Sequence, residues 1–420
     1  MIALALCGGG IEKVLSNELR KLNEQFTGKF KILDTGFGRV RFETDLYGIY
    51  CALIALRTAD RIFLEAGFFP ASNFDELFEG AKNICWEDFI HDNKTVVIDK
   101  VRCNHSQLAS ERSVQSVVHK AIADRLCSAY KKDRLPEGGE FETIRVYIEK
   151  DTARILLDIC GKPLFKRGYR IEGGIAPLRE TTASALFFLA GWRRKYQLYD
   201  PFCGSGTIPI EAALYAWNIA PGLGRKFVIS GLCIADDEIE KNVRRTLSEK
   251  IDFSYNVNIF ASDNDNNNIE NAKANLKRAV AIANVKNDHP LQGIKFWKLD
   301  AANAKSNSDY GFVICNPPYG KRLGDTETAE QGYREMSILR NNFPGWKLAV
   351  ISDHSGFESF FGAKADRCRE LTNGAINCFF YEYETELPGK TENLENMNVG
   401  GNKPLKNKIP VTTNKTEWTW

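Results

Sequence analysis

The chain reads Leu198-Tyr199-Asp200-Pro201-Phe202-Cys203-Gly204-Ser205-Gly206-Thr207 where an apolar run gives way to a helical pattern. An acid and a proline end the run, and a Gly-x-Gly turn then leads into Ile208–Ala216. Glycines let a ligand approach the backbone closely at the carboxyl edge of a sheet. Pro209 departs from the Gly-x-Gly-x-x-Gly pattern of dinucleotide sites. The stretch therefore predicts a strand–loop–helix unit that binds another kind of ligand; a purely structural corner is the alternative.

Apolar runs and amphipathic helices alternate from Tyr196 to Tyr383, which predicts an α/β fold with a parallel, doubly wound sheet. Two further acids each follow a strand-like run of this pattern. Asp263 is placed to accept hydrogen bonds from ribose hydroxyls, and Asp265 is either the alternative ribose acid or the cap of the next helix. In this topology, Asp300 would face the amino group of an adenine.

A fourth signal is Asn316-Pro317-Pro318-Tyr319, which directly follows the apolar run Phe312–Cys315. The side-chain oxygen of Asn316 and the carbonyl of Pro317 are both acceptors. Prolines stiffen the turn and lack an N–H group, so nearby carbonyls remain free for a substrate NH2 group. Tyr319 offers a ring on which a base can stack. An ordinary turn at the end of a strand is the alternative interpretation.

The bulk composition is that of a globular protein with more than one domain. The chain has 420 residues, of which 43% are hydrophobic and 26% charged, and its net charge is +2. A charge this small does not itself indicate a nucleic-acid partner, although a local basic patch could. The 11 cysteines include no C-x-x-C pair, which gives no support to a zinc ribbon or a redox pair. No signal peptide or membrane-spanning run is visible, so we expect a cytoplasmic protein without metal or membrane contacts.

The patterns divide the chain into five parts. Residues 1–65 and 66–161 each read as a small α/β unit, and 162–175 read as a linker. Residues 176–383 hold the doubly wound pattern. The segment 384–420 is rich in Asn, Lys, Thr, Gly and Pro, a composition that predicts disorder.

The linker interleaves cationic and aromatic side chains. This mixture suits RNA, because cations contact phosphates and aromatic rings stack on bases. The candidate RNA contacts are Lys166, Arg167, Tyr169 and Arg170. The alternative is that the segment only connects two domains.

The four signals together resemble Rossmann-like methyltransferases that use S-adenosylmethionine to modify exocyclic or amide nitrogen. Flanking motifs narrow the resemblance to the THUMP-containing RNA guanine-N2 methyltransferases, in particular to the single-methyltransferase form of the bacterial 23S ribosomal RNA enzymes. The motifs are KRGYR at 166–170, APLRET at 176–181, EAA at 211–213, NIAPG at 218–222 and NPPYGKRL at 316–323. The resemblance implies a ferredoxin-like domain over 1–65, a THUMP domain over 66–161 and a Rossmann-like methyltransferase domain over 176–383.

The resemblance also implies roles for individual residues. The glycines of the loop pass beneath the methionine moiety of the cofactor, and Asp200 helps to hold its amino group. The implied ligands of S-adenosylmethionine are Thr181, Asp200, Cys203, Gly204, Gly206, Asp263, Asp300 and Asn316. One departure is Lys321, where many relatives carry an acid, and we assign it no role.

The expected reaction is direct methyl transfer to N2 of a guanine flipped out of 23S ribosomal RNA. Asn316 and the Pro317 carbonyl would accept the two N–H bonds of the amino group, and Tyr319 would stack on the base. The same tetrapeptide also serves adenine-N6 methylation of DNA or RNA and glutamine methylation, and tRNA guanine-N2 methylation is possible as well. An inert RNA-binding assembly protein is the alternative outside enzymes. The sequence does not give the oligomeric state.

Overall fold

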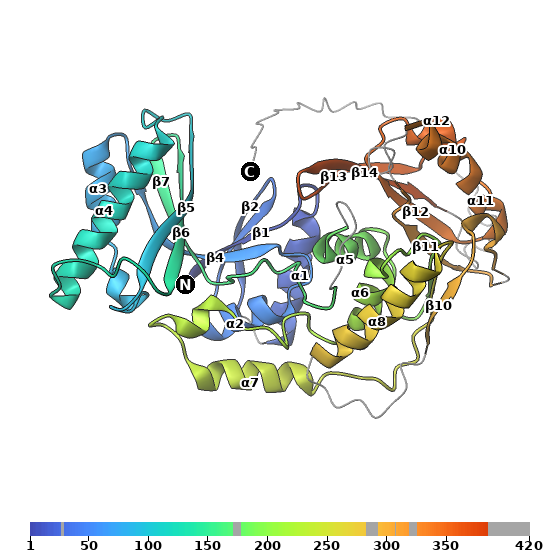
Figure 1. Ribbon diagram of the computed structural model, residues 1–420, viewed down its shortest axis with the longest axis horizontal. Coiled ribbons are helices and arrows are strands. Elements are labelled where there is room, and N and C mark those ends of the chain that lie inside the picture. The colour runs from blue at the N-terminus through green and yellow to red at the C-terminus, as the bar shows by residue number, and fades with distance from the viewer. Residues whose placement is uncertain (27–28, 171–177, 283–292, 307, 319–325, 385–420) are drawn as a thin grey trace, which may run out of the picture.

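The computed structural model describes residues 1–26, 29–170, 178–282, 293–306, 308–318 and 326–384. Two sheets of seven strands each organise the molecule, as Figure 1 shows. The first lies in the N-terminal part of the chain and the second in the C-terminal part. The predicted tail from 384 onward lies outside the described residues, apart from Glu384 itself.

The N-terminal sheet has the order β2-β3-β1-β4-β7-β6-β5. The boundary predicted between residues 65 and 66 falls inside β4, which pairs with β1 on one side and with β7 on the other. One continuous sheet therefore spans both predicted N-terminal units. Its strands are β1 (Ile2–Leu6), β2 (Lys31–Gly36), β3 (Arg39–Glu43), β4 (Arg61–Pro70), β5 (Thr95–Asn104), β6 (Phe141–Glu149) and β7 (Thr152–Asp158).

Helices pack against one face of this sheet. The longest of these helices is α4, which the Ser110 side chain caps at its start and which is followed by Lys131 in the left-handed conformation (φ 54°). Its apolar stripe, including Val114 and Val118, joins the core because these residues recur at helical spacing. The helices are α1 (Glu12–Gln25), α2 (Leu46–Ala55), α3 (Phe74–Lys82), the 3-10 turn η1 (Trp86–Asp88) and α4 (Glu111–Tyr130).

The C-terminal sheet has the order β10-β9-β8-β11-β12-β14-β13. The five strands from β10 to β12 run parallel to one another. Strand β14 pairs antiparallel with β12 on one side and with β13 on the other. The predicted doubly wound fold is therefore confirmed. The strands are β8 (Gln197–Asp200), β9 (Ile259–Asp263), β10 (Ile294–Lys298), β11 (Gly311–Cys315), β12 (Lys347–Ser352), β13 (Arg367–Asn373) and β14 (Ile376–Tyr383).

Alternate residues of β11 divide between the two faces of the C-terminal sheet. Phe312 and Ile314 join the core that contains α5, α6 and α8, whereas Val313 and Cys315 join the core that contains α10, α11 and α12. The elements between the strands are α5 (Glu180–Leu189), α6 (Thr207–Ala216), η2 (Val228–Gly231), α7 (Asp237–Ser248), α8 (Asn266–Ile282), η3 (Ala301–Asn303), α10 (Thr326–Met336), α11 (Leu339–Asn342) and α12 (Phe357–Phe361).

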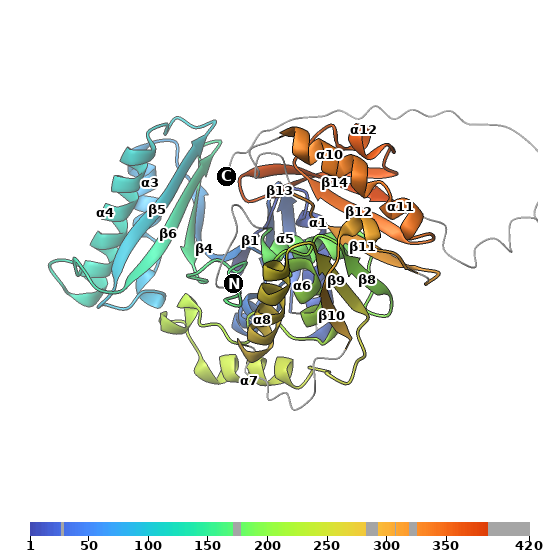
Figure 2. The same cartoon turned by 45° about the vertical axis from the view of Figure 1, so that its right-hand side comes forward.

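The N-terminal and C-terminal parts share one hydrophobic core. Helix α7 packs on α2, and Figures 1 and 2 show α7 running beneath the N-terminal part of the molecule. The backbone N–H of Gly222 donates to the Ile54 carbonyl at 2.8 Å, and a Cβ on this glycine would lie 2.7 Å from the Ile54 Cα. The N-terminal part is therefore fixed against the C-terminal part by close backbone packing.

Candidate active site

The predicted site residues gather at the carboxyl edge of the second sheet. Asp200 and Asp263 end β8 and β9, and Asp300 follows β10 by two residues. Asn316 directly follows β11, the neighbour of β8 on the other side. Because these strands are parallel, all four residues lie along one edge, at the point where the chain order switches direction. Ligands of open α/β sheets bind at such a switch point.

The glycine loop between β8 and α6 has the backbone that the sequence predicts. Gly204 has φ +51°, and apart from Gly204 itself and its two neighbours in the chain, no described residue has an atom within 4 Å of the position that its Cβ would occupy. Gly206 has φ +86°, and a Cβ there would lie 2.9 Å from the Ala272 Cβ on α8. Glycine is required at Gly206 by packing and conformation, whereas the space at Gly204 is open to a ligand.

Asp263 organises this loop. Its Oδ2 accepts a hydrogen bond from the Gly204 N–H at 2.9 Å, and its Oδ1 accepts from the Asp265 N–H and the Asn268 side chain, both at 3.0 Å. Asp265 in turn accepts from the Asn267 N–H at 2.9 Å, which satisfies a donor at the start of α8. Of the two acids considered for the ribose, Asp263 thus contacts the glycine loop and Asp265 acts at the helix terminus.

Asp200 and Asp300 differ in their surroundings. The Asp200 carboxylate is buried and accepts from the Phe202 N–H at 3.1 Å. Burial raises the pKa of Asp200 well above its ordinary value, and the nearby charge of Asp263 raises it further. Asp300 is exposed, and its Oδ1 accepts a hydrogen bond from the Ala302 N–H at 2.9 Å at the start of η3. Its position at the sheet edge, rather than burial, makes it a candidate ligand contact.

The two cysteines at this edge are structural. Cys203 and Cys315 are buried, and burial raises the pKa of both thiols well above the ordinary value. A protonated thiol is a weak nucleophile. These residues therefore suit packing of the loop and strand rather than covalent chemistry.

The Asn-Pro-Pro segment starts where β11 leaves the sheet. Asn316 is partly buried, Pro317 is buried and Pro318 is exposed. Neither proline carries an N–H, so these two positions add no backbone donor to the turn. Tyr319 and Lys321, named from the sequence, lie outside the described residues.

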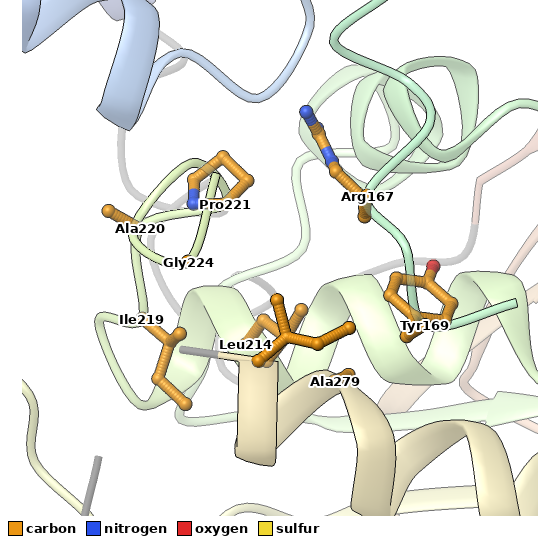
Figure 3. Close-up of a pocket in the computed structure, with 9 residues that line it drawn as sticks. Arg167, Tyr169, Leu214, Ile219, Ala220, Pro221, Gly224 and Ala279 are labelled. Carbon is orange, nitrogen blue, oxygen red and sulfur yellow. The ribbon is translucent and has the colours of Figure 1, made fainter. Parts of the chain in front are cut away.

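The structure does not support the predicted RNA contacts of the linker at Arg167 and Tyr169. Both side chains are buried, and they line a cavity of about 20 Å³ beside Leu214 and Ile219, as Figure 3 shows. Arg167 donates to the carbonyls of Leu164 and Arg57 at 2.7 and 2.6 Å. The prediction failed because cationic and aromatic side chains also suit a buried domain junction, where carbonyls replace phosphates.

The other two linker residues differ from each other. Arg170 donates to the Thr207 hydroxyl at 2.8 Å and pairs with Glu180 at 3.3 Å, with only 8% of its side chain exposed. Its partners all lie in the C-terminal part, and this burial corrects its assignment as an RNA contact. Lys166 is exposed, and its contact with RNA remains a prediction.

Sequence reasoning missed the centre of this junction. Arg57 enters from the N-terminal part and donates to the carbonyls of Leu214 and Ile219. Glu211 on α6 accepts from the hydroxyls of Tyr169 and Ser184, each at 3.0 Å. No local signal marks Arg57, because its partners lie more than 150 residues away along the chain.

The N-terminal sheet is anchored next to the candidate site. Asp60 directly precedes β4 and accepts hydrogen bonds from the Thr181 hydroxyl at 2.5 Å and from Arg179 at 2.7 Å. Gly9 donates to the Thr372 hydroxyl at 2.6 Å, in the β13–β14 hairpin region. Thr181 is buried with its hydroxyl committed to Asp60, and its role in cofactor binding remains a prediction.

Two other kinds of feature are absent from the described residues. No group of three or more His, Cys, Asp or Glu side chains that could hold a metal ion occurs among them. Within the same ranges, no helix has the length and apolar character needed to cross a membrane.

Comparisons with known proteins agree with this architecture. Residues 3–63 match the RlmL ferredoxin-like domain, residues 71–158 the THUMP domain, and residues 167–382 the family UPF0020, the RMKL-like methyltransferase domain. The chain is 37% identical over 390 residues to the protein named "Putative RNA methyltransferase YpsC" from Bacillus subtilis (strain 168), covering 92% of this chain and 97% of that protein.

Solved structures are similar over the same extent. The structure of SMU.472 complexed with S-adenosylhomocysteine has a TM-score of 0.80 and 33% identity, covering 92% of this chain and 98% of that one. The structure of a predicted N6-adenine-specific DNA methylase from Listeria monocytogenes str. 4b F2365 has a TM-score of 0.82 and 35% identity, covering 92% and 96%. The chain therefore belongs to the THUMP-containing RNA methyltransferase family, and its cofactor is S-adenosylmethionine.

Proposed function

We propose that this protein methylates N2 of a guanine in 23S ribosomal RNA, with Asn316 and Pro317 as the residues that hold the amino group. The observation that carries the proposal is the position of Asn316 directly after β11, beside β8 and its glycine loop. Acceptors for an NH2 group and the cradle for a methyl donor thus lie at one edge of one sheet. The resemblance of the sequence to guanine-N2 enzymes and the THUMP domain support the choice of base and of RNA.

The residues at this edge fit S-adenosylmethionine. Open space above Gly204 gives room for a ligand against the backbone, and Asp263 holds the loop in place through the Gly204 N–H. Asp263 and Asp300 would contact the ribose and adenine. Asp200 would help to hold the amino group of the methionine moiety, and Gly206 would pass beneath that moiety. When bound, S-adenosylmethionine supplies an electrophilic methyl group on sulfonium sulfur.

The chain supplies orientation for the acceptor. The guanine N2 lone pair is delocalised into the ring, so the amino group is a poor nucleophile. The Asn316 side-chain oxygen and the Pro317 carbonyl would accept its two N–H bonds and stabilise positive charge that develops on nitrogen. N2 forms the new N–C bond as the S–C bond breaks, and one N2 proton then leaves to solvent. Tyr319 would stack on the flipped base.

The first test is the substitution Asn316→Ala. Removing one preorganised partner of a developing charge typically costs about 100-fold or more in kcat. Methyl transfer to ribosomal RNA from a strain lacking this protein should fall accordingly, while cofactor affinity by calorimetry changes little. Asn303→Ala, an exposed asparagine in the same domain, is the matched control. Equal turnover of Asn316→Ala and wild type would remove the proposed role of Asn316.

The main rival is adenine-N6 methylation, the kind of activity that has been predicted for the Listeria protein, with DNA as its substrate. Both reactions methylate a planar NH2 group, and the two acceptors at Asn316 and Pro317 suit either. Mass spectrometry of nucleosides from a deletion strain separates them. Loss of N2-methylguanosine from 23S RNA supports the proposal, whereas loss of N6-methyladenosine supports the rival. Loss of N2-methylguanosine from tRNA alone would move the substrate to tRNA.

A protein that binds RNA without catalysis is the remaining alternative. Titration with S-adenosylmethionine tests it, because an inert relative that has lost the cofactor site would show no binding heat.

A further inference from the structure

The C-terminal sheet has a cavity on the face opposite α6 and α8. Those two helices pack against β8, β9 and β10 from one side, as Figure 2 shows. Tyr199 and Trp297 of these strands instead belong to the second core or pack against it. A cavity of about 270 Å³ lies there, lined by the three strands and by the loops next to η3 and α11. No residue within an α-helix that the structure describes contributes to this lining.

Five aromatic side chains line this cavity. The Tyr199 ring stacks against the rings of Trp297 and Phe343, with ring centres 6.3 and 5.2 Å apart. Phe260 and Trp346 complete the aromatic wall. Phe260 and Trp297 are only partly buried, whereas the other three are buried. Aromatic surface is therefore available to a group that enters the cavity.

The size and chemistry of the cavity suit a single aromatic side chain. Its volume lies just below the range of about 300–1,000 Å³ that is typical of small-molecule sites. Aromatic rings attract another ring through offset-stacked or edge-to-face contacts. The lining includes one charged residue, Lys305, which is exposed, and an ammonium group can lie over the face of an indole. An indole thus matches both the rings and the cation.

The chain contains two tryptophans in the segment 385–420, which lies outside the described residues. They are Trp418 and Trp420, and the other five of its seven tryptophans are buried or partly buried. The segment is otherwise rich in Asn, Lys, Thr, Gly and Pro. An indole buries a large apolar area, and a segment too polar to build a core can bury it only against another surface. The two tryptophans therefore indicate that the segment has a docking site.

The described chain ends beside the cavity. Glu384 forms an ion pair with Lys347 at 3.5 Å, and Lys347 directly follows Trp346 of the cavity lining. Trp418 lies 34 positions after Glu384. A flexible segment of this length spans roughly 30 Å between its ends. The segment therefore starts next to the cavity and is long enough to return to it.

We propose that the segment 385–420 folds back on its own domain and places the indole of Trp418 or Trp420 in this cavity. The match to the methyltransferase family ends at residue 382, so the segment lies beyond the domain that the family shares. Glu417, which precedes Trp418, supplies a carboxylate for Lys305. The docked segment covers apolar surface that would otherwise favour association with other molecules. This inference goes beyond the methylation reaction and does not depend on which base is methylated.

The test follows the two indoles in the full chain by fluorine NMR. Labelling with 5-fluorotryptophan marks every tryptophan, and Trp418→Phe and Trp420→Phe each remove one signal and so assign it. A soluble gadolinium chelate broadens the signals of exposed rings. At least one of the two signals should broaden at least about 2-fold less than in a labelled peptide of residues 405–420, because a ring between aromatic side chains loses most of its exposed surface. Equal broadening in the chain and the peptide would overturn the proposal.

Filling the cavity should displace the indole. Gln197→Phe adds a ring at the cavity without removing any aromatic residue from its wall, and it should raise the broadening to the level of the peptide. Gln331→Phe makes the same change at an exposed position of α10 and is the matched control. Thermal unfolding checks that both variants keep the fold. Protection that persists in Gln197→Phe would place the indole elsewhere and overturn the assignment of this cavity.

Dilution separates docking within one chain from exchange between two copies. Protection that is kept on dilution supports docking within one chain. Protection that is lost on dilution, together with a dimer in sedimentation that dissociates in the double variant Trp418→Ala/Trp420→Ala, would assign the indole to a second copy. That outcome would overturn the proposed return of the segment to its own domain.

Discussion

The domain junction and the face of the N-terminal sheet opposite α3 and α4, here called the open face, use the same kinds of side chain in opposite environments. The junction combines Arg57, Arg167 and Tyr169 with Glu211, and all four are buried. The open face combines Arg41 and Arg154 with Phe68, which is 55% exposed. In the junction, backbone carbonyls and Glu211 surround the guanidinium groups, although the Arg57 Nη1 and Arg167 Nε atoms have no hydrogen-bond partner among the described residues. On the open face, part of each guanidinium remains at the surface. Arginine and aromatic composition therefore identifies no function until burial is known.

The largest effect should come from removing the centre of the junction. Glu211→Ala leaves Arg57 and Arg167 buried without their carboxylate, and breaking a buried ion pair costs about 3–5 kcal/mol of unfolding free energy. Burial lowers the pKa of Arg57 and Glu211 opposes this, which shows how the acid stabilises the buried cation. Denaturant unfolding measures the loss. Variants of Phe68 should keep the wild-type free energy of unfolding. Equal stability of Glu211→Ala and wild type would contradict the difference inferred between the two regions.

A smaller effect should follow from Tyr169→Phe. The substitution keeps the ring in place and removes the hydrogen bond from the Tyr169 hydroxyl to Glu211. Leaving a buried acceptor with one fewer partner costs about 1–3 kcal/mol. If the junction is structural, the affinity for ribosomal RNA stays at the wild-type value while the free energy of unfolding falls. Tyr196→Phe, on a partly buried tyrosine away from the junction, is the control. An RNA affinity that falls without a change in stability would show that Tyr169 contacts the RNA substrate.

The smallest effect, when measured per pH unit, concerns Glu142 of β6, another buried acid. Burial raises its pKa from 4.5 to about 7, and Lys94 opposes this rise. Between these two values Glu142 binds more protons in the folded protein than in the unfolded chain, so the contribution of this group to stability is full below about pH 4.5 and is lost as the pH rises through about 7. The slope is at most about 1.4 kcal/mol per pH unit.

The variant Glu142→Gln should flatten this dependence, and denaturant unfolding at several pH values measures it. Glu140→Gln, on the exposed neighbour that also pairs with Lys94, is the control. An unchanged pH slope in Glu142→Gln would show that another group titrates in this window.

The candidate site was largely predictable because its signals are local. A glycine pair after an apolar run, and an acid or asparagine at each following strand end, occupy fixed positions relative to the strands that carry them. Parallel strands bring those ends to one edge, so the sequence pattern alone was enough to group Asp200, Asp263 and Asn316. Two roles depend on the tertiary structure. Asp265 acts at a helix terminus, and Thr181 contacts Asp60 from another domain.

The sequence by itself determined the doubly wound sheet, the order of its strand-end residues and the family, because each depends on short-range pattern and on motif spacing. Only the tertiary structure decided which arginines are buried, that one sheet spans the ferredoxin-like and THUMP domains, and which face of that sheet stays open. These features depend on partners such as Arg57 and Ile219, which lie 162 residues apart along the chain. Burial is a property of the packed molecule, and no local pattern records it.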